Sequence, residues 1–197
     1  MAFKSMRSKP KAFSLFLLLF LLLLASGCLS TGPTATGRLE EGSWALYFPR
    51  SGQDPAPALC SLIGQARSSC DVAIYSLTHP DIVKALVQAH KRGVKVRVIT
   101  DKEWQRNDSQ RHAVNVLLLA GIPVKENRHA GLMHLKMVVI DGEIVTTGSY
   151  NFTRSASEKN DEMFLVVKSA ELSRACSREF ERMWNDQVNF APVTYRH

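Results

Sequence analysis

The sequence predicts an α/β fold in which one layered, mixed β-sheet is flanked by helices. Short apolar runs typical of buried strands alternate with amphipathic stretches of helical period along most of the chain. Two apolar runs then follow each other across an Asp-Gly pair, a favoured two-residue hairpin turn. A further strand and a long helix complete the pattern, so both parallel and antiparallel strand pairs are expected.

Residues 44–93 supply two strands and two helices of this prediction. Residues 44–48 form a short apolar run that predicts a strand, and residues 57–67 place Ala, Leu and Ile on one helical stripe. The run 71–77 (DVAIYSL) predicts a second strand. The amphipathic stretch 81–92 predicts a helix, because glycine commonly follows the last helical turn and Gly93 stands there.

The alternation continues after this helix. Residues 94–100 (VKVRVIT) alternate apolar and basic side chains, as a half-exposed strand does. The polar stretch 101–112 is expected to be a loop, 113–120 a helix and 122–125 a short strand.

The last third of the chain predicts a hairpin, a strand and a helix. Apolar runs at 134–140 and 144–147 flank the turn pair, residues 162–167 form the next strand, and residues 170–186 form a long helix. No internal repeat is present, so a motif found here occurs once.

The first 27 residues have the features of an export signal. Four basic residues precede an almost unbroken apolar run, Phe13 to Ala25, and small residues follow it. The run is short for a membrane-spanning helix, which needs about 20 residues, although an uncleaved N-terminal anchor remains an alternative.

The segment Leu24 to Cys28 (LASGC) resembles a bacterial lipobox, in which cleavage leaves a lipidated cysteine at the new N-terminus. The resemblance implies an exported protein, periplasmic or at the cell surface, that is anchored to the membrane through Cys28; plain secretion is the alternative. Residues 28–41 are expected to form a flexible tether, because Ser30 to Gly37 (STGPTATG) are small or polar and are interrupted by Pro33. Residues 42–197 then form a single folded domain.

The formal net charge of +7 becomes +3 when the leader is removed, because four basic and no acidic residues leave with it. An excess of that size favours anionic partners only weakly. It does not distinguish a nucleic acid from an anionic lipid.

Three cysteines remain beyond Cys28, namely Cys60, Cys70 and Cys176. No cysteine pair or Cys/His cluster has the spacing of zinc ligands, so no structural metal is expected. Export permits one disulfide, which would use Cys176, but three free thiols are the favoured expectation.

A cationic pair stands at the head of the run 134–140. Residues two apart on a strand share a face, so His134 and Lys136 are expected to point together. The rest of the run is apolar on both faces, as in a central strand covered on both sides. A lone buried histidine is more often a satisfied core residue, but a His and a Lys together are costly to desolvate unless an anion or a partner binds there.

The second strand of the hairpin delivers further polar or small residues to the same end of the sheet. Gly148 lets the backbone approach a ligand, and Ser149 and Asn151 can donate hydrogen bonds to oxyanions. Asp141 lies in the turn and is expected to be largely structural. Residues 153–158 are expected to open a helical turn whose first amides also favour phosphate.

Together these residues read His134-x-Lys136-x4-Asp141-x6-Gly148-Ser149-x-Asn151. The pattern resembles, position for position, the HKD signature of the phospholipase D superfamily. Residues 42–187 are similar to the small single-motif bacterial endonucleases of that superfamily, which implies a phospholipase D-like domain. Glu162 matches their acidic residue downstream of the asparagine and could orient an imidazole; a salt bridge to a surface lysine is its structural alternative.

The resemblance implies a phosphodiesterase that needs neither metal nor cofactor and works through a phosphohistidine intermediate. Such chemistry needs a neutral histidine that attacks phosphorus and a protonated histidine that gives a proton to the leaving oxygen. The catalytic residues implied are His134, Lys136, Asp141, Ser149, Asn151 and Glu162, and those implied to bind the substrate are Lys136, Gly148, Ser149 and Asn151.

One motif supplies only one of the two histidines. A twofold homodimer would bring His134 and its symmetry mate to one composite active site, because an isologous interface joins the same patch of both subunits.

The leading prediction for the substrate is DNA or RNA, cut with little sequence preference. A phospholipase D that hydrolyses phospholipid head-group diesters, including cardiolipin-like ones, would use the same chemistry, and a lipid-anchored enzyme would lie beside that substrate. A non-catalytic lipoprotein that binds nucleic acid or membrane is the alternative of a different class, against which the intact motif argues.

Several polar residues outside the motif carry weaker expectations. His79 and His112 are expected to be solvated. Trp104, Arg106 and Arg111 lie in the polar stretch and are expected either to edge a substrate groove or to be simply exposed.

Overall fold

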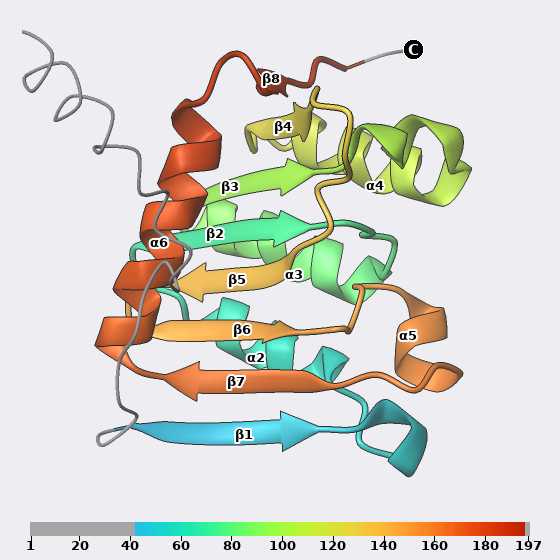
Figure 1. Cartoon of the computed structure of the whole chain (residues 1–197). Coiled ribbons are helices and arrows are strands. Elements are labelled where there is room, and N and C mark those ends of the chain that lie inside the picture. The colour runs from blue at the N-terminus through green and yellow to red at the C-terminus, as the bar shows by residue number, and fades with distance from the viewer. Residues whose placement is uncertain (1–41, 196–197) are drawn as a thin grey trace, which may run out of the picture. The chain divides into compact units, whose positions relative to one another are not determined.

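One eight-stranded sheet, in the order β1-β7-β6-β5-β2-β3-β4-β8, runs through the computed structural model, which describes residues 42–195 (Figure 1). The predicted leader, Cys28 and the tether lie outside these residues. Strand β3 is parallel to its neighbours β2 and β4 and all other pairs are antiparallel, so the predicted mixed sheet is confirmed. The strands are β1 (Ser43–Tyr47), β2 (Ser69–Ile74), β3 (Lys95–Thr100), β4 (Val124–Asn127), β5 (Lys136–Ile140), β6 (Ile144–Gly148), β7 (Phe164–Lys168) and β8 (Phe190–Pro192).

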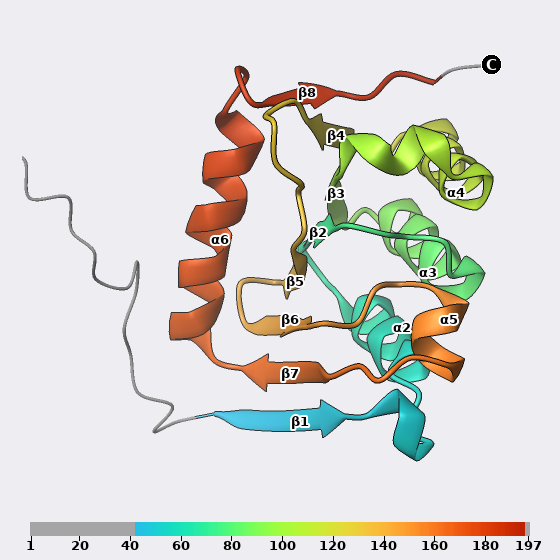
Figure 2. The ribbon, with the colours of Figure 1, turned by 45° about the vertical axis from the view of Figure 1, so that its right-hand side comes forward.

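Helices cover both faces of the sheet. Helix α6 crosses one face near one end of the strands, and the other α-helices lie on the opposite face (Figures 1 and 2). The helices are α2 (Ala56–Gln65), α3 (Pro80–Lys91), α4 (Asp108–Leu119), α5 (Arg154–Glu158) and α6 (Ala170–Asn185), with two 3₁₀ turns, η1 (Pro49–Ser51) and η2 (Lys102–Arg106).

Strand β5 lies in the middle of the sheet and contributes to two apolar cores. Val138 and Ile140 pack with residues of α2, α3 and α4, whereas Met137 and Val139 pack with residues of α6. The prediction that this run is a central strand buried on both faces is therefore confirmed. The strand begins at Lys136, so His134 lies just before it and is exposed rather than being part of it.

Helix α6 is fastened to the sheet by a buried guanidinium. The Arg97 side chain on β3 bonds Asp71 on β2 at 2.7 Å and Glu181 on α6 at 2.6 Å. Its Cζ atom also lies 4.9 Å from the ring centroid of Phe180. Partners on β2 and α6 satisfy the charge that burial would otherwise leave unpaired.

The polar stretch 101–112 was predicted to be a loop, and this was wrong. The Asn107 side chain accepts a hydrogen bond from the Gln110 N–H, which caps α4 and starts it five residues earlier than predicted. Trp104 is buried and its indole N–H bonds Glu126, so it edges no groove. Arg106 and Arg111 are exposed and pair with acidic residues of their own turns.

Other differences from the predicted elements are local. His79 is buried, not solvated, because it caps α3 and its N–H donates to the Phe152 carbonyl. His112 is exposed, as predicted. Strand β8 was not predicted, since three residues carry too little periodicity to be recognised.

Cys60, Cys70 and Cys176 are free thiols, as expected. Burial raises the pKa of each, which disfavours the reactive thiolate. Between residues 42 and 195 no helix has the length and apolar character needed to cross a bilayer.

Candidate active site

An open pocket of about 380 Å³ lies where β5 begins and β6 ends. The residues that line it are His134, Lys136, Gly148, Ser149, Asn151 and Glu162. The structure therefore brings together six of the seven motif residues named from the sequence, and only Asp141 is absent from the pocket lining.

His134 and Lys136 are in direct contact, as their spacing predicted. The Lys136 ammonium lies 3.0 Å from Nδ1 and 3.1 Å from Nε2 of the imidazole, and it also donates to the His134 carbonyl at 3.0 Å. An ammonium only donates, so the ring nitrogen that it bonds must offer a lone pair. The arrangement thus suits a neutral His134.

Lys136 is the buried member of the pair, with 8% of its surface exposed. Burial lowers the pKa of Lys136 from its ordinary value, and the negative charge of Glu162 partly opposes that shift. The ammonium attracts an anion into the pocket, and the carboxylate of Glu162 in the same wall opposes part of that attraction.

Gly148 and Ser149 hold β6 against the residues before β7. Gly148 has a φ of +139°, and a Cβ at this position would overlap the carbonyl oxygen of Met163. The Ser149 N–H donates to that carbonyl at 3.0 Å, and the Ser149 hydroxyl accepts from the Met163 N–H at 3.0 Å. Gly148 was predicted to allow close approach of a ligand, but its nearest neighbour is the chain before β7. The Ser149 hydroxyl keeps its proton free to donate.

Asn151 and Glu162 complete the wall of the pocket. The Asn151 side-chain oxygen is buried and has no hydrogen-bond partner among the described residues. This oxygen only accepts hydrogen bonds, so a phosphate oxygen would have to meet the NH₂ group of the same amide. Glu162 precedes β7 instead of opening it, and it accepts from Asn160 at 3.1 Å without bonding His134.

Asp141 lies at the opposite end of β5 and does not line the pocket, so nothing in the structure supports the catalytic role that the resemblance implied for it. Its carboxylate accepts the N–H groups of Arg67, Ser68 and Ser69 at 2.8–3.2 Å and the hydroxyl of Ser68 at 2.8 Å. Asp141 and Gly142 both have positive φ, at 54° and 68°, as the predicted hairpin turn requires. The structural role expected for Asp141 from the turn itself is therefore confirmed.

The predicted helical turn after the motif is α5, capped by the Thr153 side chain. None of its residues lines the pocket, so its amides do not contribute to the site.

Sequence reasoning missed Tyr75, which follows β2. The centroid of its ring lies 4.6 Å from the centroid of the His134 imidazole. The Lys136 ammonium lies 5.2 Å from the centroid of the Tyr75 ring. Tyr75 reaches the site only because β2 pairs with β5, which is distant in the sequence. No local sequence pattern predicts that pairing.

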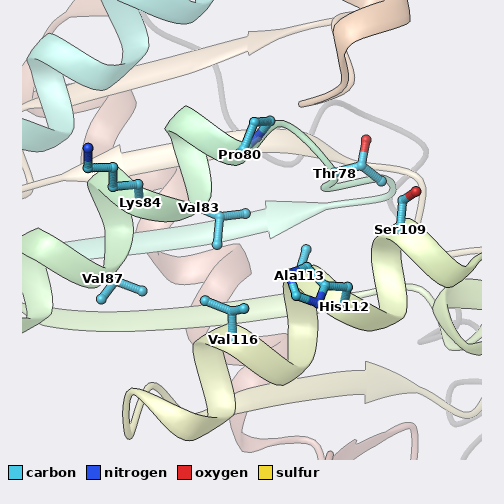
Figure 3. A pocket seen from close by; sticks show the side chains of 9 residues that line it. All are labelled: Thr78, Pro80, Val83, Lys84, Val87, Ser109, His112, Ala113 and Val116. Atoms are coloured by element: carbon cyan, nitrogen blue, oxygen red, sulfur yellow. The ribbon is translucent and has the colours of Figure 1, made fainter.

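Of the other hollows formed by the described residues, one shares residues with this site and one does not. One of about 350 Å³ adjoins the site, shares Ser149 and Glu162 with it, and is walled by Phe48 and Arg50. The other, of about 300 Å³, lies between α3 and α4, and no residue of the motif lines it (Figure 3). Among the described residues, no group of three His, Cys, Asp or Glu side chains is arranged to hold a metal ion.

Residues 59–184 match a protein-family model described as "Cardiolipin synthase, PLD-like domain". The chain belongs to the phospholipase D superfamily. Nuc from Salmonella typhimurium, a phospholipase D family member, superposes with a TM-score of 0.71 and 31% identity, over 80% of this chain and 100% of its own. NucT from Helicobacter pylori superposes with a TM-score of 0.66 and 29% identity, over 79% of this chain and 100% of its own. The predicted phospholipase D-like single domain is confirmed.

Among the curated relatives of this phospholipase D superfamily member is the mitochondrial cardiolipin hydrolase of Xenopus laevis. It is 34% identical over 137 residues, which make up 70% of this chain and 62% of the relative. The chain thus spans less than two thirds of that relative's length.

Proposed function

We propose that the protein is a phosphodiesterase that forms a phosphohistidine on His134 and needs no metal ion. The observation that carries the proposal is the contact between the ammonium of Lys136 and the imidazole of His134 at the bottom of an open pocket. A phosphate oxygen is a stronger acceptor for the ammonium than an imidazole is. Its arrival would draw Lys136 away and free the His134 lone pair for attack on phosphorus.

Three side chains of the pocket are suited to stabilise the transition state. Lys136, the Ser149 hydroxyl and the Asn151 amide can each donate to the equatorial oxygens as negative charge develops there. The leaving oxygen needs a proton from a second imidazole, and no other histidine lines this pocket within the described residues.

We propose that a second copy of the chain supplies this imidazole across a twofold axis. In support, α6 crosses the sheet at the end of the strands opposite to the site, so this helix does not cover the site (Figure 1). Phe48 and Met163, which we call the rim patch, are 44% and 41% exposed and line the hollow that adjoins the pocket. An exposed apolar patch beside an incomplete site is the kind of surface that an isologous dimer buries.

Nucleic acid is the substrate that we propose first. The motif and the domain resemble the single-motif bacterial endonucleases, and the pocket is open enough to admit one diester of a long polymer. The diester is bound by the same donors in any such substrate, so the motif itself does not fix what the diester joins.

A phospholipid is the second candidate, because a curated relative with 34% identity is named a cardiolipin hydrolase. Leu132, in the loop that precedes the motif, is 52% exposed and could contact an acyl chain.

Two assays in the presence of EDTA separate these candidates. One measures nicking of supercoiled plasmid, and the other measures release of phosphatidic acid from cardiolipin vesicles. We expect plasmid nicking by the wild type and none by His134→Ala. His112→Ala, a matched change of an exposed histidine outside the site, should remain active. Turnover that disappears with EDTA would contradict the metal-independent mechanism, and cardiolipin cleavage without nicking would favour the second candidate.

We further propose that the protein is exported and anchored through a lipid on Cys28. The support is the lipobox-like segment and the leader before it. Labelled palmitate should enter the wild type but not Cys28→Ala, while Cys60→Ala remains labelled. Label that persists in Cys28→Ala would contradict the anchor.

A further inference from the structure

Tyr75 lies immediately after β2, at the end of the sheet where the pocket opens. Ile74 pairs with Lys136 in the β2–β5 ladder, and the Tyr75 N–H continues this ladder by donating to the Leu135 carbonyl at 3.0 Å. The backbone of Tyr75 is therefore tied to the residue between His134 and Lys136.

The ring of Tyr75 contacts both members of the cationic pair. The imidazole of His134 lies 4.6 Å away between centroids at an interplanar angle of 54°, and the Lys136 ammonium is 5.2 Å from the ring centroid. The latter distance is that of a cation–π contact. Tyr75 does not line the pocket, so the ring supports the pair from outside the space that a substrate would occupy.

A buried amide holds Tyr75 in place. Gln110 of α4 is 5% exposed, and its Nε2 donates to the Tyr75 carbonyl at 2.9 Å. Its Oε1 accepts from the Ser76 hydroxyl at 3.1 Å, and its own N–H is capped by Asn107. Both backbone hydrogen-bonding groups of Tyr75 are thus paired, which fixes the backbone from which the ring projects toward His134.

We propose that Tyr75 is a positioning residue whose ring face fixes the orientation of His134; this rests on the phosphodiesterase function proposed above. A neutral imidazole attacks phosphorus along the direction of one lone pair, so its rotation decides whether attack is possible. The ring of Tyr75 restricts that rotation from one side.

The face of the ring, and not the hydroxyl, carries this role. The Tyr75 hydroxyl makes no hydrogen bond within residues 42–195, whereas the ring contacts are retained by phenylalanine. Tyr75→Phe is therefore the conservative variant that should preserve function, and Tyr75→Leu removes the aromatic face. Tyr75→Met is a second variant in case leucine does not allow folding.

The experiment measures kcat and KM for bis(p-nitrophenyl) phosphate, a small diester that reaches only the pocket. We expect Tyr75→Phe to match the wild type and Tyr75→Leu to lose about 10- to 100-fold in kcat with little change in KM, since small misplacement of a reacting group costs rates of that order. Tyr47→Leu is the matched control, because Tyr47 of β1 packs on Phe164 of β7 and does not line the pocket.

A second measurement does not depend on turnover. The ring current of Tyr75 should shift the NMR signals of the His134 imidazole, and the shift should disappear in Tyr75→Leu and persist in Tyr75→Phe. An inactive wild type would overturn the phosphodiesterase function and the positioning role of Tyr75 together. An active wild type with an unaffected Tyr75→Leu, or with Tyr75→Phe as impaired as Tyr75→Leu, would overturn the Tyr75 proposal alone.

Discussion

Lys136 shows how one buried residue sets the working pH of the proposed site. The ammonium is needed in its charged form to bind the diester, and burial lowers its pKa while Glu162 partly restores it. A lysine loses its charge as the pH rises through its pKa. Because that pKa is lowered, we expect kcat/KM to fall on the alkaline side before the ordinary lysine value of 10.5 is reached.

Glu162 should affect the pH at which kcat/KM falls on the alkaline side, which we call the alkaline limb. Glu162→Gln removes the negative charge that raises the pKa of Lys136, so the limb should move to lower pH. A pH–rate profile of both proteins checks this, with Glu158→Gln on α5 as a control outside the pocket. A limb that stays in place or moves to higher pH would show that Glu162 does not act on Lys136.

Gly148 should tolerate no side chain. Its φ of +139° and the overlap of a Cβ with the Met163 carbonyl predict that Gly148→Ala costs about 1–3 kcal/mol of unfolding free energy. Gly64→Ala is the matched control, because a Cβ there meets nothing within 4 Å and alanine stabilises a helix by about 0.5–1 kcal/mol. Urea denaturation measures the unfolding free energy of both variants. Equal changes in the two variants would contradict the steric explanation.

At the scale of elements, the β5–β6 hairpin is joined to the start of β2 by Asp141. Burial raises the pKa of this carboxyl, but the N–H groups of Ser69, Ser68 and Arg67 and the Ser68 hydroxyl outweigh it, so the folded pKa is lowered. Its contribution to stability is therefore complete above the unfolded aspartate pKa of about 3.9 and is lost as the pH falls through the lower folded value.

Asp141→Asn keeps the left-handed turn but loses the charge, so we expect about 1.5–3 kcal/mol less stability at pH 7. The difference from the wild type should shrink as the pH falls below about 3.9. Glu143→Gln, an exposed acid in the same turn region, is the control for charge alone. A large loss of kcat in a still folded Asp141→Asn would return this residue to the catalytic machinery.

The elements that sequence patterns predicted best are those with strong local signals. The β5–β6 hairpin could be predicted because apolar runs and an Asp-Gly turn specify it locally. The start of α4 could not, because its cap Asn107 lies inside a polar stretch that resembles a loop. Trp104 was misplaced for the same reason, since its burial depends on Glu126 of β4, a contact that no local pattern announces.

At the scale of the whole molecule, the motif predicted which residues gather but not what holds them. His134, Lys136, Ser149 and Asn151 meet because β5 and β6 pair antiparallel, which the hairpin already implied. Tyr75 reaches the site through the pairing of β2 with β5 and is held by Gln110 of α4. These contacts join segments 35 to about 60 residues apart, so periodicity does not reveal them.

The proposed homodimer can be tested at the rim patch. Met163→Glu should place a charge in the proposed dimer interface, and we expect a monomer by sedimentation with activity lost and circular dichroism unchanged. Leu119→Glu, at an exposed leucine of α4 away from the pocket, should remain dimeric and active. A fully active monomer in either variant would contradict the composite site.

The most direct test of the central claim, that one His134 of each pair attacks phosphorus, is mass spectrometry of the enzyme quenched during turnover of a diester in an alkaline denaturant, which preserves the acid-labile P–N bond of a phosphohistidine. We predict a phosphoryl-linked adduct on the His134 peptide that reaches about one per two chains, because each dimer would hold a single composite site. An adduct on another residue, an adduct on every chain, or turnover with no adduct at all would contradict it.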